Sequence, residues 1–221
     1  MGSEMCIRDS PGFYLDGNMT LFGENGNDAK AGMKLSDKAA EVTKYIATKL
    51  VGNEKHFVLD GNGRGLAGLK DGSVDAMFSG SWDAAKVKDA LKDNYAAAAL
   101  PTFKTESGEH QMKSFAGSKA VAYNTNTKSP EMAAKFAAFL GSKKSQQIAF
   151  EKEGAIPSDK SLADSVKAEP AAVAQMETIA KTSVLQPAIP EMGKFWDPVQ
   201  AFGTSISVSY THLRAHETDS Y

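Results

Sequence analysis

The chain has 221 residues, of which 42% are hydrophobic, 24% charged and 9% aromatic, a balance typical of soluble globular proteins rather than disordered or fibrous ones. The chain has 25 Lys and Arg against 27 Asp and Glu. Its net charge therefore gives no electrostatic attraction to nucleic acid or to an anionic membrane. No apolar run approaches the roughly 18 residues of a membrane span, and the N-terminus lacks a signal-peptide pattern. The single cysteine, Cys6, excludes an internal disulfide. Partners must therefore be recognised by local sites.

The two ends of the chain are related through DNA rather than through protein chemistry. Residues 2–10 can be encoded by GGC TCG GAG ATG TGT ATA AGA GAC AG, whose reverse complement encodes Val-Ser-Tyr-Thr-His-Leu-Arg-Ala, the sequence of residues 208–215. A library adapter joined to both ends of a DNA fragment produces this relationship, and a natural gene has no reason to. We interpret residues 1–10 and 208–221 as adapter-derived tails that are not native and lie outside fold reasoning.

The insert between the tails, residues 11–207, has a different composition. It contains no cysteine, and without the two basic and four acidic residues of the tails the counts become 23 basic and 23 acidic. Its natural termini are then unknown. The missing signal peptide consequently says nothing about localisation.

Helices and short strands alternate along the insert. Residues 36–50 carry an apolar stripe at helical spacing, with Ser36 at the N-cap position, and predict an amphipathic helix; the stripe consists of Ala39, Val42, Tyr45, Ile46 and Leu50. Strands are expected at 55–59, 73–78, 95–100 and 120–123. Helices are expected at 66–69, 83–91, 129–141, 142–152, 161–167, 170–182 and 190–202. Strands alternate with helices first and helices then predominate, which indicates the α/β class.

The sequence contains no convincing motif for nucleotide binding, metal binding or catalysis. Residues 63–68 fit the pattern G-x-G-x-x-G, but the next strand is expected near residue 73, too soon for the roughly 30-residue unit of a dinucleotide site. We interpret this segment as a glycine-rich loop entering a short helix. His56 and His110 stand apart, and no G-x-S-x-G occurs, so we expect no metal site, cofactor or catalytic residue. Basic residues are interspersed with acids, which argues against a nucleic-acid partner.

The two tryptophans lie beside turn or helix-start signals, in SGSWD (79–83) and in FWDP (195–198). A planar ring at the mouth of a loop can stack on the C–H face of a sugar, while nearby Asp and amide groups take its hydroxyls. The pattern alone favours this interpretation and a pair of ordinary core residues about equally.

Several blocks together resemble the extracellular solute-binding proteins of sugar ABC importers, specifically the maltose and maltodextrin branch. They are GSVDAMFSGSW (72–82), ALPTFK (99–104), residues 135–156 with the core FAAFLGSKKSQ, and IPEM (189–192) followed by Phe195-Trp196. The resemblance covers nearly all of residues 11–206. It implies an α/β, periplasmic-binding-protein-like two-lobe fold that is incomplete here. Residues 11–104 and 154–207 would belong to the C-terminal lobe, and residues 105–153 to a segment of the N-terminal lobe.

The resemblance also implies a function. The family captures maltose- or maltodextrin-like oligosaccharides by aromatic stacking and lobe closure, and delivers them to the membrane permease of an ABC importer. The implied location is periplasmic or extracellular, with or without a lipid anchor, and the complete protein would be a monomer and no enzyme. Trp82 and Trp196 match stacking positions, and Phe13 or Tyr14 a third, although the surrounding PGFY departs from the usual pattern. Gln200 matches a polar residue that is arginine in some relatives.

Three alternatives remain open. The same scaffold would also suit another oligosaccharide, such as a galactoside or xyloside, because an aromatic platform recognises sugar faces more readily than particular epimers. A carbohydrate-active enzyme would need two opposed carboxylates, which the tryptophan blocks do not supply. The 221-residue product would also be explained as a non-functional, truncated reading frame.

Overall fold

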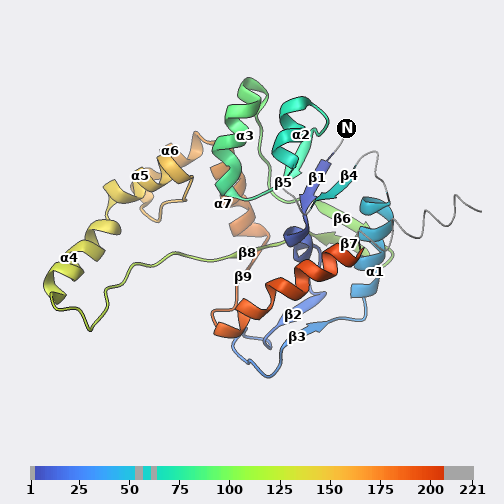
Figure 1. The fold of residues 1–221 in the computed structure, drawn as a ribbon, viewed down its shortest axis with the longest axis horizontal. Coiled ribbons are helices and arrows are strands. Elements are labelled where there is room, and N and C mark those ends of the chain that lie inside the picture. Colours follow the sequence, from blue (N-terminus) through green and yellow to red (C-terminus); the bar gives the residue numbers. More distant parts are fainter. Residues whose placement is uncertain (1–2, 53–56, 61–63, 207–221) are drawn as a thin grey trace, which may run out of the picture.

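The computed structural model describes residues 3–52, 57–60 and 64–206. Figure 1 shows a body of small sheets and helices from which one arm projects. We define the arm as residues 117–153 and the body as the described residues up to 116 and from 170 onward. No helix among the described residues is both long and apolar enough to cross a membrane.

Within the described residues the strands form four small sheets rather than one large sheet. Three strands pair in parallel in the order β4–β1–β5, β2–β3 and β6–β7 are antiparallel, and β8–β9 is parallel. The strands are β1 (Ser3–Cys6), β2 (Met19–Leu21), β3 (Met33–Leu35), β4 (Phe57–Asp60), β5 (Ala76–Phe78), β6 (Thr102–Thr105), β7 (Gly108–Gln111), β8 (Ser114–Ala116) and β9 (Ser183–Leu185).

Strand β1 lies inside the segment that we interpret as an adapter-derived tail. It is the middle strand of its sheet, with Ser3 opposite Phe57 of β4 and Ala76 of β5. Strand pairing uses main-chain N–H and C=O groups, which nearly every residue offers, so a short segment without an apolar pattern can still join two strands. The tail origin of residues 1–10 stays a prediction, and residues 208–221 lie outside the described residues.

The helices cover the body and form the arm. They are α1 (Ala39–Tyr45), α2 (Gly65–Asp71), α3 (Ala84–Leu91), α4 (Pro130–Leu140), α5 (Lys143–Glu153), α6 (Ala163–Lys167) and α7 (Pro170–Lys181). A π-helical segment, η2 (Ile46–Val51), continues α1, and residues 196–206 form a further helix. Short 3-10 helices are η1 (Ile7–Phe13), η3 (Ser81–Asp83), η4 (Lys92–Asn94), η5 (Lys160–Leu162) and η6 (Pro190–Lys194).

Capping residues and prolines predict the ends of the arm helices α4 and α5 better than the start of α1. Pro130 occupies the first turn of α4, the Ser142 side chain accepts the Ser145 N–H at the start of α5, and Gly154 ends α5 in the left-handed conformation. The predicted N-cap at Ser36 is wrong, because α1 begins at Ala39. The Ser36 hydroxyl instead donates to Asn18 Oδ1 at 3.0 Å, so a tertiary contact occupies the group that would cap the helix.

Two of the predicted strands are absent. Residues 95–100 and 120–123 form no strand in the structure. Alanine, which is depleted in strands, makes up half or more of both segments, and among the described residues neither segment has a partner edge. The predicted helix over 190–202 divides into η6 and the helix over 196–206. For the strand predicted over 55–59, residues 57–59 lie in β4, whereas residues 55 and 56 lie outside the described residues.

The body is built around two apolar clusters. The first joins the predicted stripe of α1 to side chains from η1 and the β6–β7 hairpin; its buried members are Phe13, Tyr14, Ala39, Val42, Ile46, Val51, Phe103, Met112 and Ile206. The second holds the C-terminal segment against β2, and its buried members are Leu21, Phe22, Met192, Phe195 and Val199. Burying a large aliphatic or aromatic side chain contributes about 1.5–3 kcal/mol, so these clusters supply the main stabilisation of the body.

A close backbone crossing joins η1 to the chain after β7. The Lys113 N–H donates to the Gly12 carbonyl at 3.0 Å, and a Cβ at residue 12 would lie 2.9 Å from the Lys113 carbonyl oxygen. Only glycine allows the two chains to approach so closely. Asp16 reinforces the crossing, since its carboxylate contacts Lys113 Nζ at 2.8 Å and accepts the Gln111 N–H at 3.0 Å.

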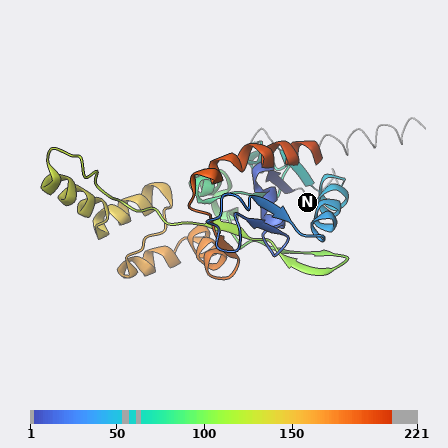
Figure 2. The same cartoon turned by 90° about the horizontal axis from the view of Figure 1, so that it is seen from below.

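The arm leaves the body after β8 and returns through α5 (Figure 2). A small third cluster, formed by Phe150 of α5, Val166 of α6 and Ala172 of α7, connects the end of the arm to the body. By contrast, α4 contains no buried residue. The arm is therefore held at its two ends and not along its length.

Candidate functional site

Trp82 projects from η3 with its indole largely in solvent. The residue is 71% exposed. A Cβ at residue 80 would lie 2.2 Å from the ring atom Cζ3 of Trp82, so the six-membered ring rests directly on the Gly80 backbone. Glycine at this position thus lets the ring lie against the chain while most of the indole stays accessible.

A carboxylate stands beside this indole. The Ser79 hydroxyl donates to Asp83 Oδ2 at 2.6 Å, and Lys86 Nζ lies 3.2 Å from Oδ1. The Ser79 hydrogen bond, helped by Lys86 and opposed by partial burial, lowers the pKa of Asp83. Asp83 is therefore ionised at neutral pH, and a carboxylate has lone pairs to accept further hydrogen bonds.

The segment carrying Trp82 lies next to the point where the arm ends. A Cβ at Gly154, which follows α5, would lie 3.5 Å from the Ser81 carbonyl oxygen. Lys88 of α3 pairs with Glu169, the residue before α7, at 2.8 Å. These contacts place Trp82 at the return of the chain from the arm to the body.

Trp196 is half-buried and begins the helix over 196–206. Its ring packs edge-on against Phe195, at a centroid distance of 5.2 Å and an angle of 73°, and against Phe115 of β8, at 5.9 Å and 82°. Edge-to-face contacts of this kind fix the orientation of an aromatic ring. Because the arm begins directly after β8, Trp196 stands at the other junction between the body and the arm.

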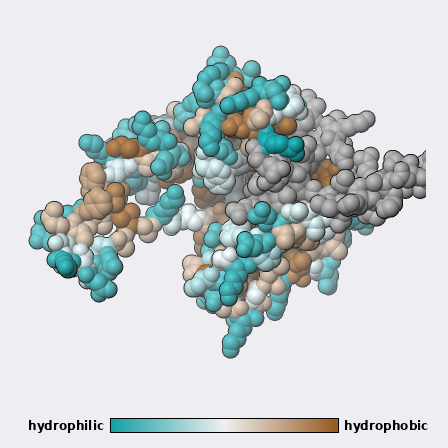
Figure 3. Space-filling view, in the orientation of Figure 1, coloured by the Kyte–Doolittle hydropathy of each residue, from teal (hydrophilic) through white to brown (hydrophobic). Residues whose placement is uncertain are grey.

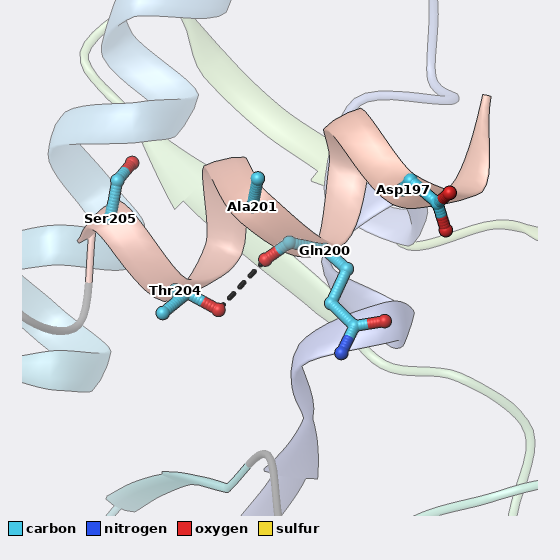
Figure 4. A pocket seen from close by; sticks show the side chains of 5 residues that line it. All are labelled: Asp197, Gln200, Ala201, Thr204 and Ser205. Carbon is cyan, nitrogen blue, oxygen red and sulfur yellow. Dashed lines mark hydrogen bonds between the residues drawn. The ribbon is translucent and has the colours of Figure 1, made fainter. Parts of the chain in front are cut away.

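One face of the helix after Trp196 lines a shallow surface hollow (Figure 4), formed by Asp197, Gln200, Ala201, Thr204 and Ser205. The Thr204 hydroxyl donates to the Gln200 main-chain carbonyl at 2.9 Å, so the hydrogen of this hydroxyl is used within the helix. Asp197 directly follows Trp196, and Gln200 follows one turn later. The helix therefore carries a carboxylate and an amide within a turn of the indole, although a single helix face cannot enclose a ligand.

Phe13 and Tyr14, the expected third platform, lie in the core. They are 2% and 3% exposed. Phe13 packs on Phe103 at 5.1 Å, and the Tyr14 hydroxyl hydrogen bonds to Thr43 Oγ1 at 2.8 Å. Burial raises the pKa of Tyr14 to about 12, with the Thr43 hydrogen bond opposing. Both rings belong to the first apolar cluster, so neither has an open face for a sugar in this structure.

The structure thus places the predicted residues at three places, which are the two ends of the arm and the core. Trp82 and Trp196 flank the two junctions of the arm, Phe13 and Tyr14 fill the core, and no ring contact joins the two tryptophans among the described residues. Gly80 and Phe115, which contact the two indoles, were not predicted. The Gly-x-Trp spacing at 80–82 is a local signal for the first, whereas Phe115 lies 81 positions before Trp196 and has no local signal.

The other candidate motifs lead to no site. Among the described residues, no group of three or more His, Cys, Asp or Glu side chains could hold a metal ion. Helix α2 begins at Gly65, as expected for a glycine-rich loop that enters a short helix, while Gly63 and His56 lie outside the described residues. His110 packs on Phe103, and its Nε2 lies 3.0 Å from Thr105 Oγ1, so it braces the β6–β7 hairpin.

Comparison with known proteins decides the family. The model of the bacterial extracellular solute-binding proteins matches residues 8–178. The chain belongs to this family. A galactooligosaccharide-binding protein of Bacillus subtilis (strain 168) is 32% identical over 135 residues, covering 59% of this chain and 30% of that protein. Strand β1 lies before the matched range.

Solved structures of this kind share the fold. A structure described as "with acarbose" is 36% identical, has a TM-score of 0.80, and is matched over 99% of this chain and 62% of its own. The maltodextrin-binding protein MalE1 from L. casei BL23 is 25% identical, with a TM-score of 0.77 over 94% of this chain and 57% of its own. The predicted α/β, periplasmic-binding-protein-like fold is thereby confirmed. The chain spans less than two thirds of each of these relatives.

The B. subtilis relative and MalE1 are named as oligosaccharide-binding and maltodextrin-binding proteins, and the family is described as one of solute-binding proteins. Its description places it outside the cytoplasm, in agreement with the predicted periplasmic or extracellular location.

Proposed function

We propose that this chain acts as part of the substrate-binding component of an ABC importer and binds maltodextrin-like oligosaccharides through Trp82 and Trp196. The observation that carries the proposal is the position of the two indoles at the two junctions between body and arm. Ligands of two-lobed proteins bind between the lobes, where residues from both sides can contact them. Asp83, Asp197 and Gln200 stand beside the indoles and would accept or donate hydrogen bonds to sugar hydroxyls.

The body and the arm would belong to different lobes. We assign residues 11–104 and 154–207 to one lobe and most of 105–153 to the other. Residues 105–116 pack on the rest of the body through the β6–β7 hairpin, Met112 and β8, so we place the crossing itself at residue 117. A sugar that contacts both lobes would stabilise the closed form, as is general for periplasmic binding proteins, and the membrane permease would recognise that form.

The test uses a completed protein, in which this chain is joined to the part of the acarbose-structure relative that it does not match. Trp196→Ala should weaken binding of maltodextrins by about 30-fold, since losing a buried aromatic contact at a binding site costs about 2 kcal/mol. Isothermal titration calorimetry measures this change. Met33→Ala, which truncates a 49% exposed side chain on β3, is the matched control and should leave affinity unchanged. Equal affinities of Trp196→Ala and the parent protein would refute the assignment.

A galacto-oligosaccharide is the second candidate ligand. It is favoured by the 32% identity to the galactooligosaccharide-binding protein of B. subtilis, and both tryptophans would stack on either sugar. A panel of maltodextrins, galacto-oligosaccharides and xylo-oligosaccharides, titrated into the completed protein, separates the candidates. Tightest binding of a galacto-oligosaccharide, weakened by Trp196→Ala, would replace the maltodextrin proposal and keep the site.

A further inference from the structure

The Trp82 ring lies flat on the Cα of Gly80. A Cβ at residue 80 would lie 2.2 Å from Cζ3, 2.3 Å from Cη2 and 2.5 Å from Cε3 of the indole. A carbon beside the edge of the ring would be close to one ring atom and clearly farther from its two neighbours. The three similar distances therefore place the missing Cβ over the ring face, so the Gly80 backbone covers one face of the indole.

The backbone at Gly80 does not itself require glycine. Its φ of −103° and ψ of 177° are extended, a conformation that every residue can adopt. The three atoms nearest to a Cβ at this position all belong to the Trp82 ring. Glycine is needed at residue 80 for the space that the ring occupies and not for the path of the chain.

Asp83 closes the turn on which the ring lies. Its N–H donates to the Gly80 carbonyl at 3.2 Å, and its Oδ2 accepts the Ser79 hydroxyl at 2.6 Å. The Ser79 hydrogen bond is the main cause of the lowered pKa of Asp83, and the Trp82 indole contributes in the same direction. Two hydrogen bonds thus fix the turn, and the indole contacts both Gly80 and the carboxylate.

The opposite face of the indole is open. Trp82 is 71% exposed, and among the described residues 64–120 it is the only large hydrophobic side chain that is exposed. Figure 3 shows mainly hydrophilic side chains over α3, which follows the turn. A protein partner is usually marked by a contiguous apolar patch, whereas a sugar offers a small C–H face surrounded by hydroxyls. A single ring in hydrophilic surroundings matches the sugar better.

We propose that Gly80 is a positioning residue for ligand binding, which holds the Trp82 indole with one face on the chain and the other face open before a sugar arrives. A ring that is already fixed loses little freedom on binding, and ordering one free side chain weakens binding by about 3- to 10-fold. Any side chain at residue 80 would displace the ring. This inference rests on the sugar-binding role proposed for Trp82 and adds the group that orients it.

Fluorescence tests the position of the ring without a sugar. In the 221-residue chain with Trp196→Phe, Trp82 is the remaining tryptophan. Gly80→Ala should lower the fluorescence anisotropy of Trp82 and increase its quenching by acrylamide, while the far-ultraviolet circular dichroism stays the same. Gly141→Ala, where a Cβ would meet no atom nearer than 3.7 Å, is the matched control and should change neither signal.

Calorimetry of the completed protein tests the consequence for the ligand, with maltodextrins and galacto-oligosaccharides as probes. Gly80→Ala should weaken binding by about 3- to 10-fold, and Gly141→Ala should leave it unchanged. In protein that already carries Trp82→Ala, Gly80→Ala should have no further effect, because no ring is left to position. A purely structural role of Gly80 would weaken binding equally in both backgrounds.

Two results would overturn the positioning role while the proposed ligand site stands. One is unchanged anisotropy and quenching in Gly80→Ala, and the other is a loss of affinity in Trp82→Ala without any loss in Gly80→Ala. Equal losses from Gly80→Ala with and without Trp82 would likewise refute it. A different result, Trp82→Ala binding sugar as tightly as the parent protein, would refute the proposed function of Trp82 and the role of Gly80 with it.

Discussion

Helices α1 and α4 have the same kind of sequence pattern and opposite surroundings. In α1 and its continuation, Ala39, Val42 and Ile46 are 4%, 1% and 0% exposed. In α4, Met132, Phe136 and Phe139 follow an equally clear stripe and stay more than half exposed. The stripe tells which face of a helix is apolar. It does not tell what covers that face, which depends on chain that is distant in sequence.

The difference comes from what meets each face. The stripe of α1 is met by Phe13 of η1, by Tyr14 directly after it and by Phe103 from the β6–β7 hairpin. These elements are joined to each other by the crossing at Gly12 and Lys113. The face of α4 meets nothing comparable, because the arm touches the body mainly through the small cluster around Phe150. The elements of the body consequently share one packed cluster, whereas the apolar face of α4 stays exposed.

The largest expected effect is on the free energy of unfolding, when a stripe position of α1 and its continuation is compared with a stripe position of α4. Ile46→Ala should lower the free energy of unfolding of the 221-residue chain by about 2–5 kcal/mol, because it leaves a cavity in a fully buried site. Phe136→Ala should change it by less than about 0.5 kcal/mol, as is usual for an exposed side chain. Urea unfolding followed by circular dichroism measures both. Similar losses at the two positions would show that α4 is covered in solution.

A smaller effect compares two glycines, one in the body and one in the arm. Gly12→Ala should cost about 1–3 kcal/mol, since the new methyl group would press on the Lys113 carbonyl and separate the crossing chains. Gly117→Ala should be neutral or slightly stabilising, because nothing lies within 4 Å of a Cβ there. Thermal melts of the two variants give the comparison. A Gly12→Ala protein as stable as the parent would contradict the close crossing.

The smallest effect concerns a single hydroxyl in the body. Tyr14→Phe removes the hydrogen bond to Thr43 and should cost about 1 kcal/mol at neutral pH. The pKa of Tyr14 is raised to about 12 from the ordinary value of 10.0, so the unfolded chain loses this proton first as pH rises. The stability of the parent protein that depends on the neutral hydroxyl is fully present below pH 10.0 and is lost between 10.0 and about 12.

Denaturant unfolding at several pH values isolates that contribution. The difference in unfolding free energy between the parent and Tyr14→Phe should shrink and then reverse as pH rises above about 10, because phenylalanine has no proton to lose. A constant difference from pH 8 to pH 11 would show that the Tyr14 hydroxyl reaches solvent in the folded protein.

Local signals predicted the helices better than the strands. Helices such as α4, α5 and α7 depend on periodicity and on Pro130, Ser142, Gly154 and Pro170 at their ends, all of which act within a few residues. Strands depend on a partner edge, so residues 95–100 were expected to pair and do not, whereas the hairpin over 102–111 was not expected. Pairing is a long-range property, and a three- or four-residue strand carries too few residues to reveal it.

The candidate site shows the same division. Turn signals beside Trp82 and Trp196 were sufficient to select both indoles, and Gly80 could be associated with the first because it is two residues away. Phe115 and the contact of Gly154 with Ser81 bring together residues separated by more than 70 positions. The expectation for Phe13 and Tyr14 came from the family resemblance, and it did not anticipate that both rings enter the core.

The sequence by itself determined the α/β composition of the chain and the apolar faces of its helices, and it selected the two tryptophans as candidate ligand contacts. The blocks around those tryptophans also indicated the solute-binding family, because side-chain chemistry at fixed spacing is a local property. Only the tertiary structure decided that the stripe of α1 is buried while that of α4 is open, and that the two indoles flank the junctions of the arm. Those outcomes depend on which distant segments meet, and burial of apolar surface is a property of the meeting and not of either segment alone.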